Sequence, residues 1–373
     1  MREMHDLGSV LDHVGREGSL DGTVVQGVDL SESEHVVTSV TCRGTTFLGC
    51  GLGPGALAHV IATGGIAFPD LDGLPFEPYR PRLYAQGELL HGWDPDTAGS
   101  FDERALDSRI HRWSSLTPPG RNPEVLDALA RRLHDHAIDD ALGEHLDDHP
   151  EVVAVMGGHS VLRTDAEYRT VAELGRAMAR EGWYVATGGG PGAMEAANLG
   201  AWLSPRDDDA LDEALALLSV EPDFHRADGY LAAGLDVLRR FDDGADSLAV
   251  PTWFYGHEPT NQFATSVAKY FANSIREDGL LAIATRGVVF APGAAGTLQE
   301  VFQDATQNHY EVFGVVSPMV FLDTEFWTRT LPAEPLLRTL AGERAYADLV
   351  GCVDGADAAM AFLRYHPPVT RAR

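Results

Sequence analysis

The fold of this chain is indicated by residues 183–202, WYVATGGGPGAMEAANLGAW. An apolar run ends in three glycines, and a helical pattern follows Pro191 directly. Upstream, EVVAVMGG (151–158) is another apolar run that ends in glycine, and VAELGRAMAREG (171–182) is amphipathic. Short apolar strands that alternate with helices indicate βαβ units. The sequence therefore predicts an α/β fold, with a Rossmann-like parallel sheet that carries helices on both faces.

The same alternation continues toward the C-terminus. We expect strands within SLAVPTWF (247–254), LLAIATRGVVFAPG (280–293) and GVVSPMVFLD (314–323), and helices within LQEVFQDATQNHY (298–310) and DAAMAFLRYH (357–366). Residues 203–247 are acidic and predict a mostly helical insertion. These patterns define a predicted nucleotide-binding domain at residues 109–373.

Residues 1–108 differ in character and form a separate N-terminal region of unassigned role. TVVQGVDL (23–30), HVVTSVTC (35–42) and TTFLGCGL (45–52) predict short strands, so this region is a smaller β-containing part of the fold. The repetition is loose and has no fixed period, so a solenoid is not predicted. Residues 73–108, rich in Pro, Gly and Asp, indicate a connecting segment.

Charge and composition narrow the function. The chain has 373 residues and a net charge of −28, which argues against binding a nucleic-acid polymer or an anionic membrane surface. The three cysteines form neither a CxxC motif nor a disulfide framework, the first residues lack a signal-peptide pattern, and no spanning segment is evident. We therefore expect a cytoplasmic protein whose partner is a small molecule.

Two glycine-rich turns are the candidate ligand-binding motifs of the sequence. The first is Gly188-Gly189-Gly190-Pro191-Gly192, and the second is Pro292-Gly293-Ala294-Ala295-Gly296-Thr297. Each closes an apolar run and opens a helix, so that free backbone N–H groups and the positive helix end favour an anion such as phosphate. A tight βα turn without a ligand is the alternative for either turn alone. The first turn is not GxGxxG, which disfavours NAD.

Glu300 has two interpretations. Thr297-x-x-Glu300 matches a capping box, in which both side chains satisfy backbone N–H groups of the helix start. Alternatively, the carboxylate is a catalytic group beside the second turn. Spacing alone favours the cap.

Taken together, GGGPGAMEAANLGA and PGAAGTLQE resemble the paired signatures of the Lonely Guy (LOG) family, long labelled "lysine decarboxylase". The resemblance covers about residues 150–330. MGGHSVLR (156–163) is similar to the family's first phosphate-side loop, which includes Gly157, Gly158 and Ser160. The family has a Rossmann-like fold, is usually dimeric, and hydrolyses the N-glycosidic bond of nucleoside 5′-monophosphates to free base and ribose 5-phosphate.

The resemblance implies roles for individual residues. Glu300 matches the catalytic glutamate, and the family arginine corresponds to Arg276, although its usual offset falls on Glu277. The positions matched to phosphate and nucleotide binding in the two turns are Gly188, Gly189, Gly190, Gly192, Met194, Gly293, Ala294, Ala295, Gly296 and Thr297. The family loop that helps to form the base pocket corresponds to residues 251–261, with Tyr255, Glu258 and Asn261 as candidates. There, the alternative is that Trp253 and Phe254 finish a buried strand.

The expected reaction requires neither a metal nor a redox cofactor. A pyridoxal-phosphate decarboxylase is disfavoured because the only lysine, Lys269, lies outside any recognisable cofactor motif. His145 and His149 have a spacing that can bind metal, but we expect them, with His134 and His136, to face solvent. The turn at Gly51-Leu52-Gly53-Pro54-Gly55 is expected to be structural.

Two functions remain open. The first is a nucleoside 5′-monophosphate phosphoribohydrolase, expected as a homodimer or larger homo-oligomer. The second is a sensor or carrier that binds a nucleotide-derived ligand on the same fold without cleaving it. The direction of the Glu300 side chain distinguishes them: toward the ligand cleft for the enzyme, or back to its own helix end.

Overall fold

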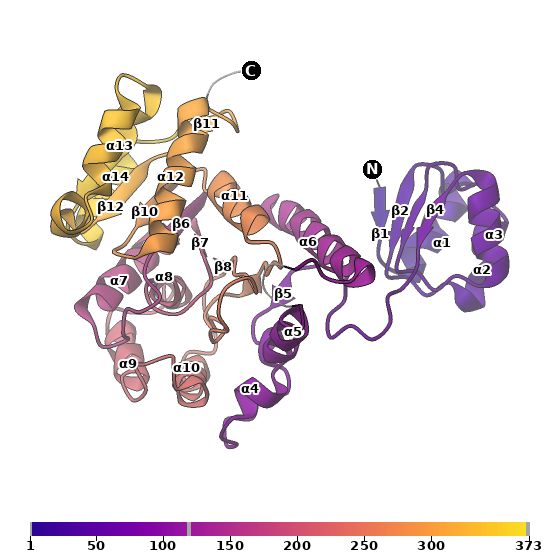
Figure 1. The fold of residues 1–373 in the computed structure, drawn as a ribbon, viewed down its shortest axis with the longest axis horizontal. Helices are drawn as coiled ribbons and strands as arrows, with labels where there is room; N and C mark the ends of the chain where they lie inside the picture. Colours follow the sequence, from indigo (N-terminus) through magenta and orange to yellow (C-terminus); the bar gives the residue numbers. More distant parts are fainter. Residues whose placement is uncertain (1, 118–120, 371–373) are drawn as a thin grey trace. The chain divides into compact units, whose positions relative to one another are not determined.

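A computed structural model of the protein describes residues 2–117 and 121–370 (Figure 1). The chain forms two compact units, Met1–Leu83 with Leu116–Gly143, and Tyr84–Ser115 with Glu144–Arg373. We call them the first and the second unit. The predicted boundary at 108/109 differs from this division, because it falls inside helix α5 (Leu106–Ser114). The Asp107 carboxylate of α5 pairs with Lys269 Nζ at 2.8 Å, which fastens this helix within the second unit.

The second unit is built on an eight-stranded sheet with the order β13-β12-β10-β6-β7-β8-β9-β5. All neighbouring strands are parallel except β9 and β5, which are antiparallel. The strands are β5 (Tyr84–Ala85), β6 (Val152–Met156), β7 (Tyr184–Thr187), β8 (Leu248–Ala249), β9 (Ser266–Val267), β10 (Gly287–Phe290), β12 (Met319–Leu322) and β13 (Val350–Val353).

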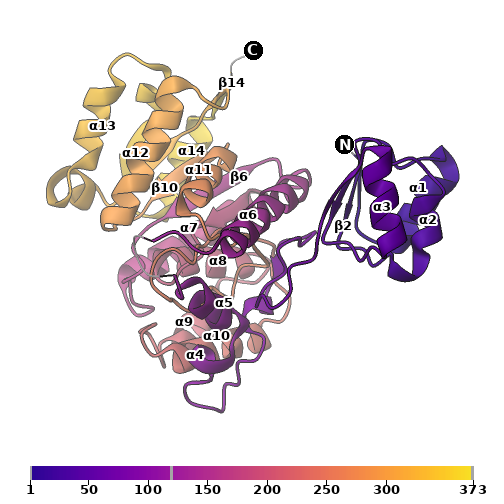
Figure 2. The same cartoon turned by 45° about the vertical axis from the view of Figure 1, so that its right-hand side comes forward.

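Helices cover both faces of this sheet, as predicted. On one face α7 (Ala166–Arg180) packs on α8 (Ala193–Trp202) and α14 (Ala356–Tyr365). On the other, α12 (Ala295–Tyr310) packs on α11 (Asn273–Ile283) and α13 (Ala333–Ala341). In Figure 2, α12 and α13 lie together at the upper left, and α7 and α8 lie below them. The Rossmann-like α/β prediction is confirmed.

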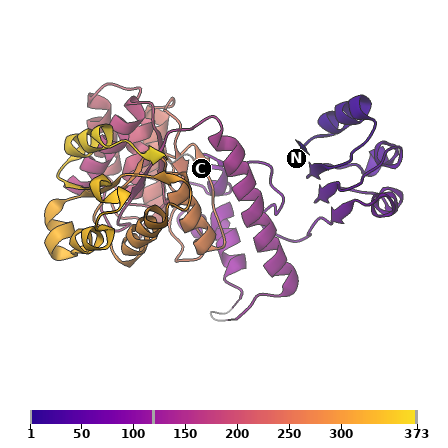
Figure 3. The same ribbon diagram turned by 90° about the horizontal axis from the view of Figure 1, so that it is seen from above.

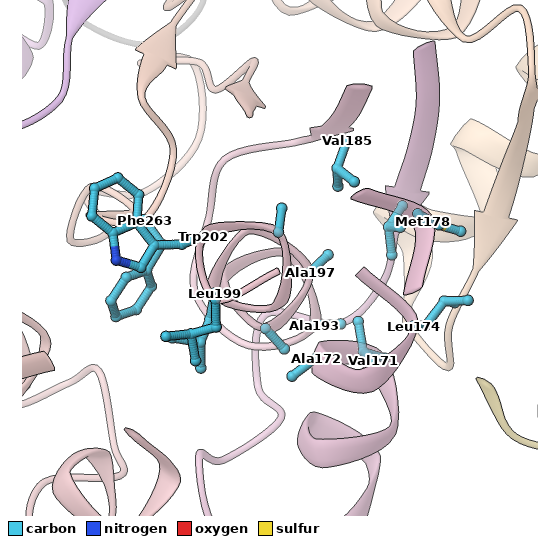
Figure 4. Packing of buried hydrophobic residues seen from close by; sticks show 14 of the residues in the cluster. Val171, Ala172, Leu174, Met178, Val185, Ala193, Ala197, Leu199, Trp202 and Phe263 are labelled. Atoms are coloured by element: carbon cyan, nitrogen blue, oxygen red, sulfur yellow. The ribbon is translucent and has the colours of Figure 1, made fainter. Parts of the chain in front are cut away.

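The core of the second unit centres on α8. Figure 4 shows α8 end-on, with Val185, Val171 and Phe263 among the buried side chains around it. Helices α7 and α8 approach each other closely at Gly200. A Cβ at this position would lie 1.9 Å from the Ala172 carbonyl oxygen, so only glycine permits the approach. The small residues of AMEAANLGA therefore bring this helix against its neighbour and fix the turn from which it starts.

Other parts of the second unit refine the sequence predictions. Residues 203–247 contain helices α9 (Asp209–Leu218) and α10 (Ala227–Arg240). The run LLAIAT, expected to be part of a strand, belongs mostly to α11, and the strand begins only at Gly287. The remaining elements are α4 (Ser100–Arg104), β11 (Val315–Val316), β14 (Val369–Thr370), and short helical turns at Glu88–Leu90, Phe326–Thr330 and Ala345–Leu349.

The first unit has a four-stranded parallel sheet in the consecutive order β1-β2-β3-β4. Its strands are β1 (Arg2–Met4), β2 (Thr23–Gln26), β3 (Thr46–Leu48) and β4 (Ile66–Phe68), and its connecting helices are α1 (Leu7–Glu17), α2 (Glu34–Thr38) and α3 (Pro54–Thr63). A short turn (Ser31–Ser33) precedes α2. The N-terminal part of α6 (Val125–Leu146), up to Gly143, also belongs to this unit.

The first unit corrects one sequence prediction and explains another observation. HVVTSVTC, expected as a strand, contains helix α2, whose Val36 and Val37 are buried in the core of this unit. The strands begin at residues 2, 23, 46 and 66, so each strand–helix repeat spans 21, 23 or 20 residues. Figure 3 shows the three connecting helices, α1, α2 and α3, on one side of the strands of this unit. The loose repetition in the sequence therefore does reflect a structural repeat, which variable loop lengths obscure.

Candidate functional site

Three βα turns meet at the carboxyl edge of the large sheet. They follow β6, β7 and β10 and lead into α7, α8 and α12. The N–H of Gly158 donates to the Pro292 carbonyl at 2.9 Å, and the N–H of Ala193 donates to the Gly158 carbonyl at 3.1 Å. The chain leaves β6 in one direction and β10 in the other, so these turns lie at a switch point, where α/β sheets bind ligands. The structure thus brings together the three motifs selected from the sequence.

The first glycine-rich turn needs its glycines for close approach. Gly192 has φ of +71°, and a Cβ there would lie 2.4 Å from the Gly158 carbonyl oxygen. Gly192 is the N-cap of α8, and because glycine has no side chain, the start of this helix carries no side-chain cap. Met194 places its sulfur against the turn, since a Cβ at Gly188 would lie 2.7 Å from Sδ. The backbone of this turn is therefore packed from behind by its own helix.

The second turn presents a helix start to solvent. Helix α12 begins at Ala295 with Ala294 as its N-cap, and no side chain caps it. Ala294, Ala295 and Gly296 are exposed, whereas Thr297 is buried with its hydroxyl against Gly293. The first N–H groups of a helix have no intrahelical partner, so an exposed start of this kind suits an anion. In the first phosphate-side loop, Ser160 is exposed as well.

Arg276 and Glu300 form a buried ion pair beside these turns. Arg276 Nη1 lies 3.2 Å from Glu300 Oε1. The guanidinium also donates from Nε to the Val250 carbonyl at 2.6 Å and from Nη2 to the Gly188 carbonyl at 3.3 Å. Burial raises the pKa of the Glu300 carboxyl, and Arg276 partly offsets this effect. The pair therefore connects α11, α12 and the first glycine-rich turn.

The capping-box interpretation of Glu300 is wrong. Helix α12 starts two residues before Thr297, so Thr297 is not the N-cap. The Glu300 carboxylate bonds to Arg276 of another helix and not to the N–H groups of its own first turn. The sequence suggested the cap because the spacing alone does not show where a helix begins.

The segment 251–261 divides into an anchored part and an exposed part. Trp253 is buried and donates from Nε1 to Asp107 Oδ1 at 2.7 Å, and Thr260 donates to the other oxygen at 2.6 Å. Phe254 is 65% exposed, so only Trp253 fits the buried-strand alternative. Tyr255 is 52% exposed, and its hydroxyl accepts a bond from Asn273 Nδ2 at 3.0 Å. The aromatic surface available to a ligand is thus that of residues 254 and 255.

The two other candidates for the base pocket have internal partners. Glu258 pairs with His159 Nδ1 at 2.7 Å and lies near Gly190, where a Cβ would be 3.2 Å from Oε2. That bond raises the pKa of His159. Asn261 is buried, donates to Asn198 Oδ1 at 2.8 Å and accepts from the N–H of Phe263. Glu258 therefore lies at the first turn, whereas the Asn261 amide is already used inside the fold.

Sequence reasoning gave no role to several residues that shape the site, although two of them lie in the quoted motifs. Arg163, in the MGGHSVLR loop, is buried and makes a two-pronged bond to Glu195 of α8, with Nε–Oε2 at 2.9 Å and Nη2–Oε1 at 2.6 Å. Tyr168 and Tyr230 donate to the same carboxylate at 2.7 and 2.6 Å. Tyr230 comes from α10, so residues 203–247 help to hold the first phosphate-side loop. No local signal in the sequence links residues so far apart.

The histidine prediction is partly wrong. His134 is fully buried, and its ring meets that of Phe76 edge-on. His145 bonds to the Tyr184 hydroxyl at 2.7 Å, and the His149 ring stacks on Tyr184 at 3.9 Å between centroids. Only His136 is exposed. These rings serve packing because α6 and the loop after it bring them against aromatic neighbours.

Residues 150–204 match the family model described as the SLOG cluster4 family. This match contains the first phosphate-side loop and the first glycine-rich turn. It supports a relationship to the SLOG/LOG superfamily, and not to a LOG enzyme in particular. No curated protein sequence matches the chain significantly.

Similar solved structures include two proteins associated with the molybdenum cofactor. The molybdenum cofactor binding protein from Rippkaea orientalis is 16% identical, with 58% of this chain and 97% of that chain covered and a TM-score of 0.36. The molybdenum cofactor carrier protein from Chlamydomonas reinhardtii is 18% identical, with 58% and 98% covered and a TM-score of 0.36. TM1055 is 17% identical, with 58% and 99% covered and the same TM-score. Similarity at this level supports no inference about a ligand or an activity.

None of the helices within residues 2–117 and 121–370 combines the length and apolar character that crossing a bilayer requires.

Proposed function

We propose that the protein hydrolyses the N-glycosidic bond of a nucleoside 5′-monophosphate, releasing the free base and ribose 5-phosphate. The observation that carries this proposal is the buried Arg276–Glu300 pair, positioned beside the first glycine-rich turn. The exposed start of α12 would hold the phosphate, and Tyr255 would contact the base. Cleavage of the bond develops positive charge on the sugar, which a nearby carboxylate stabilises.

In this scheme Glu300 acts on the sugar and on water. Its carboxylate stabilises the positive charge at C1′ and takes a proton from the attacking water. Arg276 holds Glu300 in place through a charge-assisted bond while its other nitrogens fix the backbone of the first turn. The arrangement requires no metal or redox cofactor. We expect the assembly to be a homodimer or larger homo-oligomer, and the location to be cytoplasmic.

A second candidate function is a sensor or carrier that binds a nucleotide-derived ligand intact. One observation favours it: Nε, Nη1 and Nη2 of Arg276 all have partners within the protein. A guanidinium whose three nitrogens are all held by the protein fits a rigid site that binds its ligand intact.

Base release separates the two functions. Wild-type protein and Glu300→Gln are incubated with a panel of nucleoside 5′-monophosphates and the matching nucleosides, and free base is followed by chromatography. We expect release from monophosphates and a loss of about 10²–10³ in rate in the variant, as for removal of one preorganised charged or polar group. Glu343→Gln, which makes the same change at an exposed position, is the matched control. Nucleotide binding by calorimetry without any base release would favour the sensor or carrier.

A further inference from the structure

A second buried carboxyl group lies next to the Arg276–Glu300 pair. Glu277 follows Arg276 on α11 and is only 5% exposed. Its Oε2 accepts bonds from Asn273 Nδ2 and from Gln299 Nε2, both at 2.9 Å. Its Oε1 is buried and has no hydrogen-bond partner among the residues that the structure describes. A buried carboxyl oxygen without a partner is costly for stability alone, so this atom calls for a ligand or a proton.

The same group is linked to the loop assigned to the base. Asn273 Nδ2, which donates to Glu277, also donates to the Tyr255 hydroxyl at 3.0 Å. Tyr255 is half-exposed in the segment 251–261. Gln299, the other donor, precedes Glu300 on α12. Glu277 is therefore connected to the aromatic side of the site, whereas Glu300 is connected to the first glycine-rich turn through Arg276.

The charges around Glu277 and Glu300 favour different protonation states for the two carboxyl groups. Arg276 bonds to Glu300, and neither bond to Glu277 comes from a charged group. Burial raises the pKa of Glu277; the charge of Asp278 adds to this rise, and Arg276 and the bonds from Asn273 and Gln299 partly oppose it. A negative charge on Glu277 would in turn raise the pKa of Glu300. One guanidinium next to two buried carboxyl groups favours one carboxylate and one protonated acid. Since Oε2 already accepts two N–H bonds, Oε1 is the oxygen that would carry the proton.

We propose that Glu277 is the general acid of the site and donates its Oε1 proton to the leaving base. This inference rests on the proposed N-glycosidic hydrolysis. The bond between C1′ and the base nitrogen breaks, its electron pair passes to the base, and the proton from Glu277 neutralises the base. Water adds to C1′ and loses a proton to Glu300. A proton returned from Glu300 to Glu277 through solvent completes the cycle, and the products are neutral base and ribose 5-phosphate.

A substrate whose leaving group needs no proton tests this role. Wild type and Glu277→Gln are compared on a nucleoside 5′-monophosphate and on 4-nitrophenyl riboside 5-phosphate, whose nitrophenolate leaves unassisted. We expect a loss of about 10²-fold or more in kcat on the nucleotide, the usual contribution of a general acid, and little change on the nitrophenyl substrate. Glu300→Gln should lose activity on both. In the wild type, kcat on the nucleotide should fall at high pH as Glu277 ionises, and this fall should be absent in Glu277→Gln.

Two further variants control for structure. Glu277→Asp keeps an acid and should recover part of the nucleotide activity. Gln299→Ala removes one bond to Oε2 and should cost about tenfold or less on the nucleotide, with little change on the nitrophenyl substrate. Equal losses of Glu277→Gln on both substrates, or no loss on either, would overturn the assignment of the acid while leaving hydrolysis established. Wild-type protein that cleaves neither substrate would instead overturn the proposed function, and this inference with it.

Discussion

Two turns of nearly the same sequence, one in each unit, have different surroundings. GLGPG (51–55) follows β3 and leads into α3, and GGGPG (188–192) follows β7 and leads into α8. Both sheets are parallel at these strands, and the turn in the first unit is a genuine βα connection, which the sequence flanks did not show. The local sequence alone therefore does not identify a ligand site.

The difference lies in topology and in the groups next to each turn. The strands of the first unit follow one another in order, so no two of its neighbouring connections diverge. There, the Glu34 side chain packs against Gly53 and Gly55, which places a carboxylate from the chain itself at the start of α3. The turn at 188–192 bonds through the Ala193 N–H to the loop after β6, where the strand order reverses against β10, and the Arg276 guanidinium donates to its backbone. The comparison teaches that a glycine-rich turn becomes a candidate site where the sheet diverges.

The largest expected difference between the two turns is the loss of stability when a charged side chain next to each turn is replaced. Arg163→Met removes the partner of fully buried Glu195, which holds α8 and its turn, and should lower the free energy of unfolding by about 3–5 kcal/mol. Glu34→Gln, next to the other turn, should change it by no more than about 0.5 kcal/mol, because Glu34 is only partly buried. Chemical denaturation of both variants checks this. If the two variants lost similar amounts of unfolding free energy, the proposed difference between the two turns would be wrong.

Backbone geometry gives the next contrast. Gly192→Ala places a Cβ at φ +71° and 2.4 Å from the Gly158 carbonyl, so we expect about 2–3 kcal/mol of destabilisation and a loss of about 10² in base release. Gly53 has φ of −67°, and the nearest atoms to an added Cβ would be Oε1, Cδ and Cγ of the flexible Glu34 side chain. Gly53→Ala should therefore cost less than about 1 kcal/mol and leave base release unchanged. Thermal unfolding and base release are measured on the same preparations, and a tolerated Gly192→Ala would contradict the geometry.

The smallest expected effect depends on pH. The bond to Glu258 raises the pKa of His159 above its usual 6.5, so the pair stabilises the fold fully below pH 6.5 and loses this effect as the pH rises through the raised value. Because both side chains are partly exposed, the effect should be below about 1 kcal/mol. Unfolding of wild type and His159→Gln at about pH 5.5 and about pH 8.5 measures it. The stability gap between the two proteins should be larger at the lower pH; an equal gap at both would show that the pair does not contribute.

Much of the second unit could be predicted from the sequence, because β6, β7 and β10 are each followed by a glycine-containing turn before a helical pattern. The three turns and the Arg276–Glu300 pair were also found, the pair through its likeness to a family and not through spacing. Spacing alone misassigned Glu300 to a cap. The exposed N-cap at Ala294 shows why, since the helix starts earlier than Thr297 suggests.

Other features depend on contacts between distant residues. Val36 and Val37 favour a strand by their local propensity. In the structure they belong to the short helix α2, which buries both side chains in the core of the first unit. Asn261 was selected as a polar residue near an aromatic loop, yet its amide bonds to Asn198 of α8. The sequence does not show that Oε1 of Glu277 lacks a partner. This depends on the three-dimensional structure, in which Asn273 and Gln299 both donate to the other oxygen, Oε2.

The consecutive strand order of the first unit has a consequence for evolution. Each strand–helix repeat of 20–23 residues contacts its neighbours in chain order, as in repeat proteins, so a repeat can be duplicated or deleted without re-pairing the strands on either side of the change with distant partners. The large sheet has no such freedom, since removing β6 or β10 would dismantle the switch point. Homologous chains should therefore vary in length by whole repeats in the first unit, while the spacing of the three turns in the second unit stays nearly constant.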